Sequence, residues 1–223
     1  MGVVVYLTVN LIYLVRLEPV LHKLDALPMV SVCVPARNEE RGIRACLESL
    51  LKQDYPQFEV IVVNDHSTDR TGELIQDLAE KNSRLVVLDG ADLPEGWLGK
   101  PFALYQAFQK AKGEMLLFTD ADPVFESHAL RTAVFTMKEH DLDALTLMPK
   151  AEFGSFWERA VQPVIFGFIA SLTRFKNVNN PDHSSAMGFG AFLMFKRSAY
   201  ETIGGHEGGK ADVLEDVLIA KRL

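Results

Sequence analysis

The sequence contains few cysteines, with only Cys33 and Cys46 in 223 residues. Two cysteines are too few for the disulfide framework of a small secreted domain, and neither stands in a CxxC or Cys/His spacing that would bind zinc. Cys33 lies in an apolar stretch typical of a strand, and Cys46 in a stretch with helical spacing. We therefore expect both to be reduced core residues, as in a cytoplasmic compartment.

Basic residues are fewer than acidic residues. The chain has 23 lysines and arginines against 30 aspartates and glutamates, which gives a net charge of −7. This balance provides no general attraction for nucleic acid, so we expect no nucleic-acid partner. An acidic protein that binds a phosphate-bearing ligand needs local cations or a metal ion at the binding site.

Several catalytic signatures are missing. No GxGxxG follows the first predicted strand, and no GxSxG elbow is present. The stretch GWLGKPF contains Gly99 and Lys100 but lacks the glycine spacing of a Walker A motif and the Ser or Thr after the lysine. The histidines show no metal-ligand spacing. These absences argue against a dinucleotide-binding loop, a P-loop and a serine-hydrolase triad.

The apolar stretch from Gly2 to Val15 is shorter than the roughly 20 residues that a transmembrane helix needs. It lacks the basic start and the small-residue cleavage site of a signal peptide. A remnant of a transmembrane helix, an interfacial anchor and a buried helix all remain open. We favour a membrane role and treat residues 1–27 as a membrane-anchor-like segment. Arg16, His22 and Lys23 are consistent with a cytoplasmic flank.

From residue 28 onward, strand and helix patterns alternate. Continuous apolar runs separated by helices predict an α/β domain with a mostly parallel central sheet and helices on both faces. Asn38 is the expected N-cap of the first helix, and Gly113 the expected C-cap of the third. The patterns predict strands at 30–34, 58–65, 84–90 and 114–122, and helices at 36–54, 67–82 and 99–113.

Beyond residue 124 the pattern is less regular. The apolar and aromatic stretch 156–175 is either a core helix or a membrane-facing helix, and we favour the second. A polar loop that contains glycine follows at 177–190. The other predicted elements are a helix near 127–140, a strand at 143–149, a strand, helix and turn at 191–207, and a helix at the end of the chain.

Polar residues follow three of the predicted strands: PARNEE after the first, NDHSTD after the second and TDAD after the fourth. In parallel sheets, ligands bind at the carboxyl ends of the strands. Asp65, at the end of the second strand, could accept hydrogen bonds from a base or a ribose. Asp69 is explained equally well as a helix cap.

Asp120 and Asp122 flank a single alanine directly after an apolar run. On a strand, residues two apart face the same side, so both carboxylates could bind one hard cation. If the strand ends earlier, one could bind metal while the other holds ligand hydroxyls. Taken alone, such a pair is more often a solvated turn or a helix cap.

Together these segments resemble the family-2 glycosyltransferases, which have the nucleotide-sugar-binding GT-A fold. The resemblance covers residues 30–223 and implies a GT-A domain at 28–223. LPEGWLGKPFAL is similar to a stretch of membrane-associated carotenoid and hopanoid-type lipid glycosyltransferases. The segments that carry the resemblance are VSVCVPARNEE, VIVVNDHSTD, GKPFALYQAFQKAKGE, LLFTDAD, GGHE and EDVLIAKRL.

The resemblance implies an inverting transfer from a nucleotide-diphosphate sugar, expected to be a UDP-sugar, to a lipid-like or other hydroxyl acceptor. Mg²⁺ or Mn²⁺ would stabilise the departing nucleoside diphosphate, and a carboxylate would take the acceptor's proton. We expect the chain to work at a membrane surface, on the cytoplasmic face of the cell membrane. The implied nucleotide-sugar site comprises Pro35, Ala36, Arg37, Glu39, Asp65, Lys100 and Asp120.

Among the remaining implied site residues, Asp122 is the direct metal ligand together with Asp120, and Asp216 is the catalytic base. Gly204, Gly205, His206 and Glu215 are implied to lie near the acceptor and the donor sugar. Taken without the family, Glu215 and Asp216 would be acids that stabilise a helix start.

The sequence departs from the family at its end, because many processive relatives carry a Gln-x-x-Arg-Trp motif after the base. The chain stops at Leu223 without it, and we expect a chain truncated at its C-terminus. Two other functions stay open: a sugar nucleotidyltransferase, which would favour a glycine-rich basic loop where PARNEE stands, and a non-catalytic nucleotide-binding membrane module.

Overall fold

The computed structural model describes residues 17–20, 27–150, 152–172, 175–178, 180, 183, 185–212 and 214–223. The apolar stretch 2–15 and its basic flank lie outside these residues, so their membrane role stays a prediction. By its internal contacts the chain divides into two compact units, a larger one of residues 18–148 and 188–223 and a smaller one of residues 1–17 and 149–187. The domain boundary predicted after residue 27 likewise stays a prediction.

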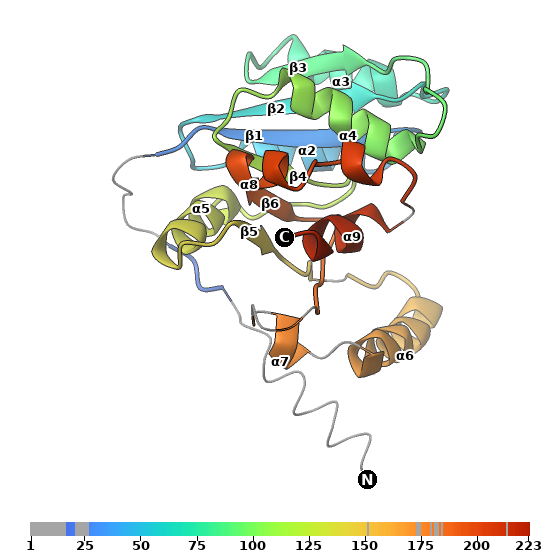
Figure 1. The fold of residues 1–223 in the computed structure, drawn as a ribbon. Coiled ribbons are helices and arrows are strands. Elements are labelled where there is room, and N and C mark those ends of the chain that lie inside the picture. Colours follow the sequence, from blue (N-terminus) through green and yellow to red (C-terminus); the bar gives the residue numbers. More distant parts are fainter. Residues whose placement is uncertain are drawn as a thin grey trace. The chain divides into compact units, whose positions relative to one another are not determined.

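The larger unit contains a six-stranded sheet, formed by β1 (Val30–Ala36), β2 (Phe58–Asn64), β3 (Leu85–Asp89), β4 (Met115–Phe118), β5 (Ala144–Thr146) and β6 (Leu193–Lys196). The strands lie in the order β3-β2-β1-β4-β6-β5 (Figure 1). Strands β1 to β4 run parallel, whereas β6 is antiparallel to both β4 and β5. The prediction of a mostly parallel sheet is confirmed.

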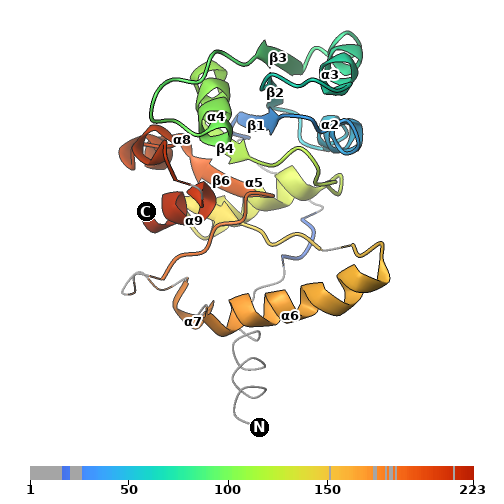
Figure 2. The same ribbon diagram turned by 90° about the vertical axis from the view of Figure 1, so that its right-hand side faces the viewer.

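Helices cover both faces of this sheet, as predicted. One face packs against α2 (Ile43–Leu51), α3 (Thr71–Ala79) and α5 (Ala129–Glu139). The other packs against α4 (Gly99–Lys110), α8 (Arg197–Thr202) and α9 (Glu215–Lys221), with the short 3-10 helix η1 (Glu207–Gly209) before α9. Figure 2 shows the two groups on opposite sides of the strands. The helix predicted near 127–140 and the strand predicted at 143–149 correspond to α5 and β5.

Strand β1 shows why the apolar runs are continuous. Successive residues of a strand point to opposite faces. Val32 and Val34 belong to the core beside α2, α3 and α5, and Cys33 belongs to the core beside α4. Since helices cover both faces, both must be apolar. Cys46 of α2 is buried as well, and both cysteines are free thiols, so the prediction of reduced core cysteines is confirmed.

Strand β1 continues to Ala36, past the proline at which the sequence predicted its end. Pro35 pairs in register with Val63 of β2, whereas the pairing with β4 ends at Cys33 and Phe118. Proline has no N–H to donate, so it is tolerated where one side of the strand has lost its neighbour. The strand therefore reaches two residues further toward its carboxyl end.

The predicted N-cap of the first helix is wrong. Helix α2 begins at Ile43, and its N-cap is Gly42, four residues beyond Asn38. Asn38 has a φ of 57° and lies in the preceding loop. Its side-chain oxygen accepts a hydrogen bond of 2.8 Å from the backbone N–H of Thr68, which holds Asn38 against the loop after β2. The side chain of Asn38 thus bonds to a residue 30 positions away and does not cap the helix.

The predicted C-cap of the third helix is also wrong. Helix α4 ends at Lys110 and its C-cap is Ala111. Gly113 follows two residues later and lies against a neighbouring backbone, where an added Cβ would come within 2.5 Å of the backbone nitrogen of Ser31. Gly113 is therefore required by close packing of two chain segments and not by a left-handed cap conformation.

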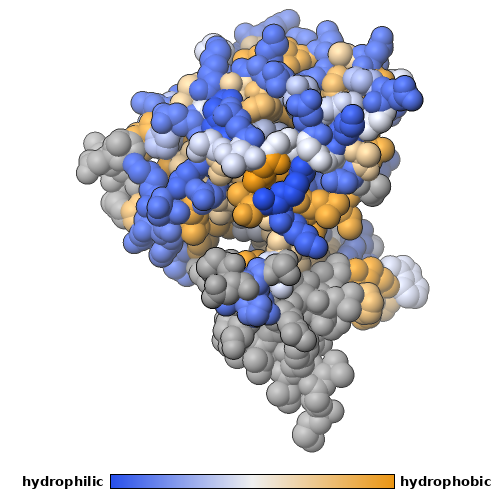
Figure 3. Space-filling view, in the orientation of Figure 1, coloured by the Kyte–Doolittle hydropathy of each residue, from blue (hydrophilic) through white to orange (hydrophobic). Residues whose placement is uncertain are grey.

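The smaller unit contains α6 (Phe156–Leu172) and α7 (Phe175–Val178). Four large apolar side chains of α6 are 65% to 74% exposed, so the alternative of a core helix for this stretch is wrong; they are Phe156, Trp157, Val164 and Phe168. Hydrophobic side chains of this helix are visible at the lower right of Figure 3. Within the described part of the chain, no helix combines the length and the apolar character needed to cross a membrane.

Candidate active site

The loops that leave β1 and β2 meet at the carboxyl edge of the sheet. Ala36 and Asn64 are paired at the ends of these strands, and the next N–H, that of Asp65, donates to the carbonyl oxygen of Ala36 at 2.8 Å. Pro35 and Ala36 are the last two residues of β1, and Ala36 is buried. These two residues, both predicted for the nucleotide site, therefore lie in the sheet at its carboxyl edge.

Arg37 and Asp65 face each other at this edge, with Nη1 of Arg37 3.5 Å from Oδ2 of Asp65. The other carboxylate oxygen of Asp65 lies 3.2 Å from Nδ1 of His66. A Cβ on Gly99, at the start of α4, would lie 3.2 Å from Oδ2 of Asp65, so glycine leaves space beside the carboxylate. A largely buried carboxylate with an exposed arginine beside it suits a polar ligand with hydroxyl or N–H groups.

Glu39 brings the loop after β1 to the predicted metal site. Its backbone N–H donates to Oγ1 of Thr71 at 2.7 Å, which fixes the loop against the start of α3. Burial, followed by the negative charges of Asp122 and Asp120, raises the pKa of the Glu39 carboxyl. The negative charges of the two aspartates therefore disfavour the ionised form of Glu39.

The predicted strand at 114–122 ends early, because β4 stops at Phe118. Of the two alternatives that the sequence left open, the shared strand face is therefore excluded, and both aspartates lie in the loop that follows. Just past the end of the ladder, the N–H of Asp120 donates to the carbonyl oxygen of Gly190 at 3.0 Å. Asp122 is exposed, and its Cβ faces Gly42, where a side chain would approach to 3.1 Å.

The donor set at this loop fits a hard divalent cation. Asp120 and Asp122 offer carboxylate oxygens, the ligands that Mg²⁺ and Mn²⁺ prefer. Within the described residues, no three His, Cys, Asp or Glu side chains are grouped so as to hold a metal ion alone. Mg²⁺ is usually held by one or two carboxylates together with substrate phosphates. By residue type, Asp120 and Asp122 could serve as the protein ligands of such a cation.

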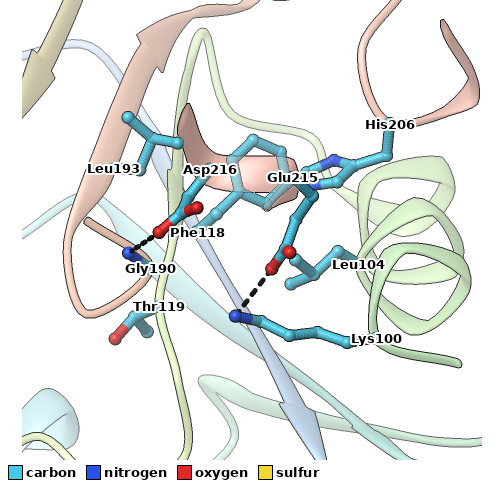
Figure 4. Close-up of a pocket in the computed structure, with 9 residues that line it drawn as sticks. All are labelled: Lys100, Leu104, Phe118, Thr119, Gly190, Leu193, His206, Glu215 and Asp216. Carbon is cyan, nitrogen blue, oxygen red and sulfur yellow. Dashed lines mark hydrogen bonds and ion pairs between the residues drawn. The ribbon is translucent and has the colours of Figure 1, made fainter. Parts of the chain in front are cut away.

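Lys100, the second residue of α4, joins two parts of the site. Its Nζ lies 2.7 Å from Oδ1 of Asp120 and 2.7 Å from Oε1 of Glu215. Figure 4 shows Lys100 and Glu215 pointing toward each other across the cavity. Burial alone would lower the pKa of Lys100, but the two carboxylates outweigh it and raise the pKa to about 12. The ammonium group is therefore charged at neutral pH.

Asp216 lies at the start of α9, beside the largely buried Glu215. Its Oδ2 accepts a 2.9 Å hydrogen bond from the N–H of Gly190, and its Oδ1 accepts one of 2.8 Å from the N–H of Val217. Both carboxylate oxygens are thus held by backbone groups, and the carboxylate borders the cavity of Figure 4. The cavity is lined by Lys100, Leu104, Phe118, Thr119, Gly190, Leu193, His206, Glu215 and Asp216.

His206 is a buried member of this cavity and is paired with Tyr200. The Tyr200 hydroxyl lies 2.6 Å from Nδ1 of His206 and accepts the backbone N–H of His206 at 3.0 Å. Burial, followed by the positive charges of Arg222 and Lys100, lowers the pKa of His206 to about 3. The ring is therefore neutral at neutral pH, and Nδ1 shares a hydrogen bond with the Tyr200 hydroxyl.

Gly204 and Gly205 lie outside the cavity that contains Asp216. They form a turn with φ values of 75° and 47°, and a Cβ on Gly205 would lie 2.5 Å from the ring of Tyr200. The two glycines border a second cavity of about 150 Å³, to which His206 also contributes. Four residues were predicted near the acceptor and donor sugar. His206 and Glu215 line the same cavity as Asp216. Gly204 and Gly205 line only the second cavity, which they share with His206.

Two further glycines hold the site together and were missed from the sequence. Gly190 donates its N–H to Asp216 and accepts the N–H of Asp120. A Cβ on Gly188 would lie 2.1 Å from the carbonyl oxygen of Asp216. From the sequence, 177–190 is predicted only as a polar loop. The available signal was the Gly-Phe-Gly triplet directly before an apolar strand, a spacing that permits close backbone approach.

The sequence matches the model of the glycosyl transferase family 2 over residues 31–204. It is 36% identical over 126 residues to the poly(ribitol-phosphate) beta-N-acetylglucosaminyltransferase TarS of Staphylococcus aureus (strain Mu50 / ATCC 700699), a match that covers 56% of this chain and 21% of TarS. It is 26% identical over 189 residues to the 4,4'-diaponeurosporenoate glycosyltransferase of S. aureus (strain USA300), with coverage of 83% and 48%. The chain thus spans about half or less of the length of these relatives.

The chain is also similar to solved structures of glycosyltransferases. The mannosyltransferase PcManGT from Pyrobaculum calidifontis, in complex with GDP-Man and Mn²⁺, is similar with a TM-score of 0.66 and 26% identity, over 97% of this chain and 57% of that one. S. aureus TarS is similar with a TM-score of 0.62 and 25% identity, over 87% and 33%. These similarities confirm the predicted GT-A fold and the resemblance to carotenoid-type enzymes. Since the family model covers more than half of the chain, the chain belongs to glycosyltransferase family 2.

Proposed function

We propose that this chain is the donor-binding and catalytic domain of an inverting glycosyltransferase, which moves a sugar from a nucleotide-diphosphate sugar to a hydroxyl acceptor. The observation that carries the proposal is the position of Gly190. Its N–H is bonded to the carboxylate of Asp216 and its carbonyl oxygen to the N–H of Asp120. One residue therefore holds the predicted base close to the predicted metal loop, as a direct transfer requires.

The transfer is a single displacement. The acceptor oxygen attacks the anomeric carbon while the bond from that carbon to the diphosphate oxygen breaks, and the configuration inverts. Asp216 takes the acceptor's hydroxyl proton as the new bond forms. A divalent cation at Asp122 and Asp120 would supply positive charge for the departing diphosphate. The backbone bonds to both carboxylate oxygens of Asp216 keep the base oriented toward the cavity.

The nucleotide part of the donor would lie over the carboxyl edge of β1 and β2. Arg37 is exposed beside Asp65, which can accept hydrogen bonds from a base or ribose. The complex of PcManGT with GDP-Man and Mn²⁺ supports a nucleotide sugar and a metal for this chain as well. We propose a UDP-sugar as the donor, with a GDP-sugar as the alternative to be tested beside it.

We propose a lipid-like hydroxyl acceptor, reached at the cytoplasmic face of the cell membrane. The similarity to a 4,4'-diaponeurosporenoate glycosyltransferase supports an apolar acceptor. The exposed aromatic side chains of α6, Phe156, Trp157 and Phe168 among them, support contact with an apolar surface. A vesicle-sedimentation assay with anionic and neutral lipids tests the membrane part separately from catalysis.

The activity is tested by incubating the chain with UDP- and GDP-sugars and a polyprenol or glycosylated-lipid panel, with Mn²⁺ or with EDTA. We expect Asp216→Asn to retain donor binding and to lose transfer by about a hundredfold or more, because only the base is removed. We expect Asp122→Ala to lose the Mn²⁺-dependent part of donor binding. Glu80→Ala is the matched control, because Glu80 is exposed at the far end of α3.

Each outcome separates one function from the others. Metal-dependent donor binding without transfer in the parent protein indicates the non-catalytic nucleotide-binding module. Release of pyrophosphate from a nucleoside triphosphate and a sugar phosphate indicates the nucleotidyltransferase. Full transfer by Asp216→Asn rejects Asp216 as the base, and donor binding that ignores EDTA rejects the metal role of Asp122.

A further inference from the structure

Lys100 occupies an unusual place in the proposed site. Its ammonium group bridges Asp120, in the loop after β4, and Glu215, at the start of α9, at 2.7 Å from each. Among the ion pairs of the described residues, these are the ones that neutralise Asp120 and Glu215. The bridge therefore joins the predicted metal loop to the helix that carries Asp216.

The two ends of the bridge differ in burial. The side chain of Glu215 is 10% exposed, whereas those of Asp120 and Lys100 are 37% and 39% exposed. A buried carboxylate that loses its partner is costly, so Glu215 should keep the ammonium group. An exposed ion pair contributes little, so the contact with Asp120 is the one that can be exchanged.

A divalent cation and the ammonium group would compete for Asp120. A hard cation approaches a carboxylate oxygen to about 2.1 Å, and Oδ1 of Asp120 already has a positive charge 2.7 Å away. Two cations on one carboxylate repel each other. A Cβ on Gly190 would lie 3.0 Å from both Nζ of Lys100 and Oδ2 of Asp120, so glycine leaves the space in which the exchange takes place.

We propose that Lys100 is an exchangeable counter-ion, which holds Asp120 while the site is empty and yields it to the divalent cation when the donor binds. Lys100, still anchored by Glu215, then contacts the donor's diphosphate. The cation alone binds weakly because it must displace Lys100, and the diphosphate removes that cost by giving Lys100 a new partner. Metal and nucleotide therefore bind with positive coupling. This inference rests on the proposed function.

The coupling predicts two effects of opposite sign for Lys100→Met. Binding of Mn²⁺ alone should tighten by at least about threefold, because the competing ion pair is removed. Binding of UDP at saturating Mn²⁺ should weaken by at least about tenfold, because a charged hydrogen bond to the diphosphate is lost. A purely structural role for Lys100 would weaken both.

The test uses calorimetric titration of the 223-residue chain with Mn²⁺ alone, and with UDP and GDP in saturating Mn²⁺. Lys110→Met is the matched control, since Lys110 is exposed in the last turn of the same helix. Lys100→Arg keeps the charge and should change both affinities less than Lys100→Met does. Thermal melting by circular dichroism confirms that each variant is folded.

Unchanged or weaker binding of Mn²⁺ alone by Lys100→Met overturns the exchange, even if nucleotide binding by the parent protein depends on metal. In that case the proposed function stands and the inference fails. If the parent protein binds neither UDP nor GDP with Mn²⁺ present, the proposed function fails and the inference fails with it.

Discussion

The buried His206 makes the stability of the larger unit depend on pH in a calculable way. His206 is 3% exposed, and burial together with the charges of Arg222 and Lys100 lowers its pKa from 6.5 to about 3. Since the unfolded chain binds the proton more tightly, lowering the pH favours unfolding. The stability that the neutral ring contributes is complete above pH 6.5 and is lost progressively down to about pH 3.

The size of this effect follows from the difference in pKa. Between pH 7.5 and pH 5 the unfolded histidine takes up its proton while the native one does not. That range includes about 1.5 pH units below the unfolded pKa, at about 1.36 kcal/mol per unit, so the expected loss is about 2 kcal/mol. His206→Asn removes the titration and keeps a side-chain amide, which can hydrogen-bond with the Tyr200 hydroxyl in place of Nδ1.

The measurement is urea unfolding at pH 7.5 and pH 5, followed by tryptophan fluorescence. Trp97 packs against Phe102 and Tyr105 of α4 and therefore reports on the larger unit. Trp157 lies in α6 of the smaller unit, so all proteins carry Trp157→Phe. Acidic residues and the exposed histidines contribute equally to the parent and to His206→Asn, and cancel in the difference between the two proteins.

Between pH 7.5 and pH 5, we expect the free energy of unfolding of the parent to fall by about 2 kcal/mol more than that of His206→Asn. The variant should be less stable than the parent at pH 7.5, because the pairing with Tyr200 is altered, and this gap should shrink or reverse at pH 5. If the two proteins differ by the same free energy of unfolding at both pH values, the reasoning is refuted, since His206 would then titrate alike in the native and unfolded chains.

Two further predictions concern the packing of the larger unit. Gly113→Ala would put a Cβ 2.5 Å from the backbone nitrogen of Ser31, and we expect the free energy of unfolding to fall by about 1–3 kcal/mol in the same assay. An unchanged midpoint for Gly113→Ala contradicts the packing argument. Burial, followed by the charge of Asp122, raises the pKa of the Cys46 thiol to about 12, and burial raises the pKa of Cys33, so neither should react with DTNB at pH 8 before unfolding. Release of thionitrobenzoate by the native protein contradicts this.

The sheet and its ligand edge could be predicted because their signals are local. A strand buried on both faces is a continuous apolar run, and β1, β2 and β4 all show one. The polar residues directly after such runs must lie at the carboxyl edge, since parallel strands end there together. Asp65 and Asp120 were placed correctly on that edge by this reasoning alone.

The helix ends and the end of β4 could not be predicted because partners distant in the sequence decide them. Asn38 has the chemistry of an N-cap, but Thr68 takes its side-chain oxygen 30 residues away. The run before Asp120 looks like strand, yet β4 ends at Phe118, and the N–H of Asp120 bonds to Gly190, which is distant in the sequence. Neither partner can be identified from the residues next to it. A local pattern gives the type of an element better than its boundary.

The strand β6 shows the same limit at the level of topology. It lies between β4 and β5 and runs antiparallel to both, although it follows β4 by more than 70 residues in the chain. Its four residues, Leu193–Lys196, are too few for a period to be seen. The sequence predicts a strand here but contains no local signal for its neighbours or its direction.

This antiparallel strand explains why the site could form at all. Because β6 runs opposite to β4, the residues that lead into β6 lie at the same edge as the residues that follow β4. Gly190 therefore meets Asp120 there and also reaches Asp216 of α9. A parallel strand in this position would have brought its carboxyl end to that edge and left the segment 188–190 at the opposite one. The reversal of one short strand thus joins the loop of Asp120 to Asp216.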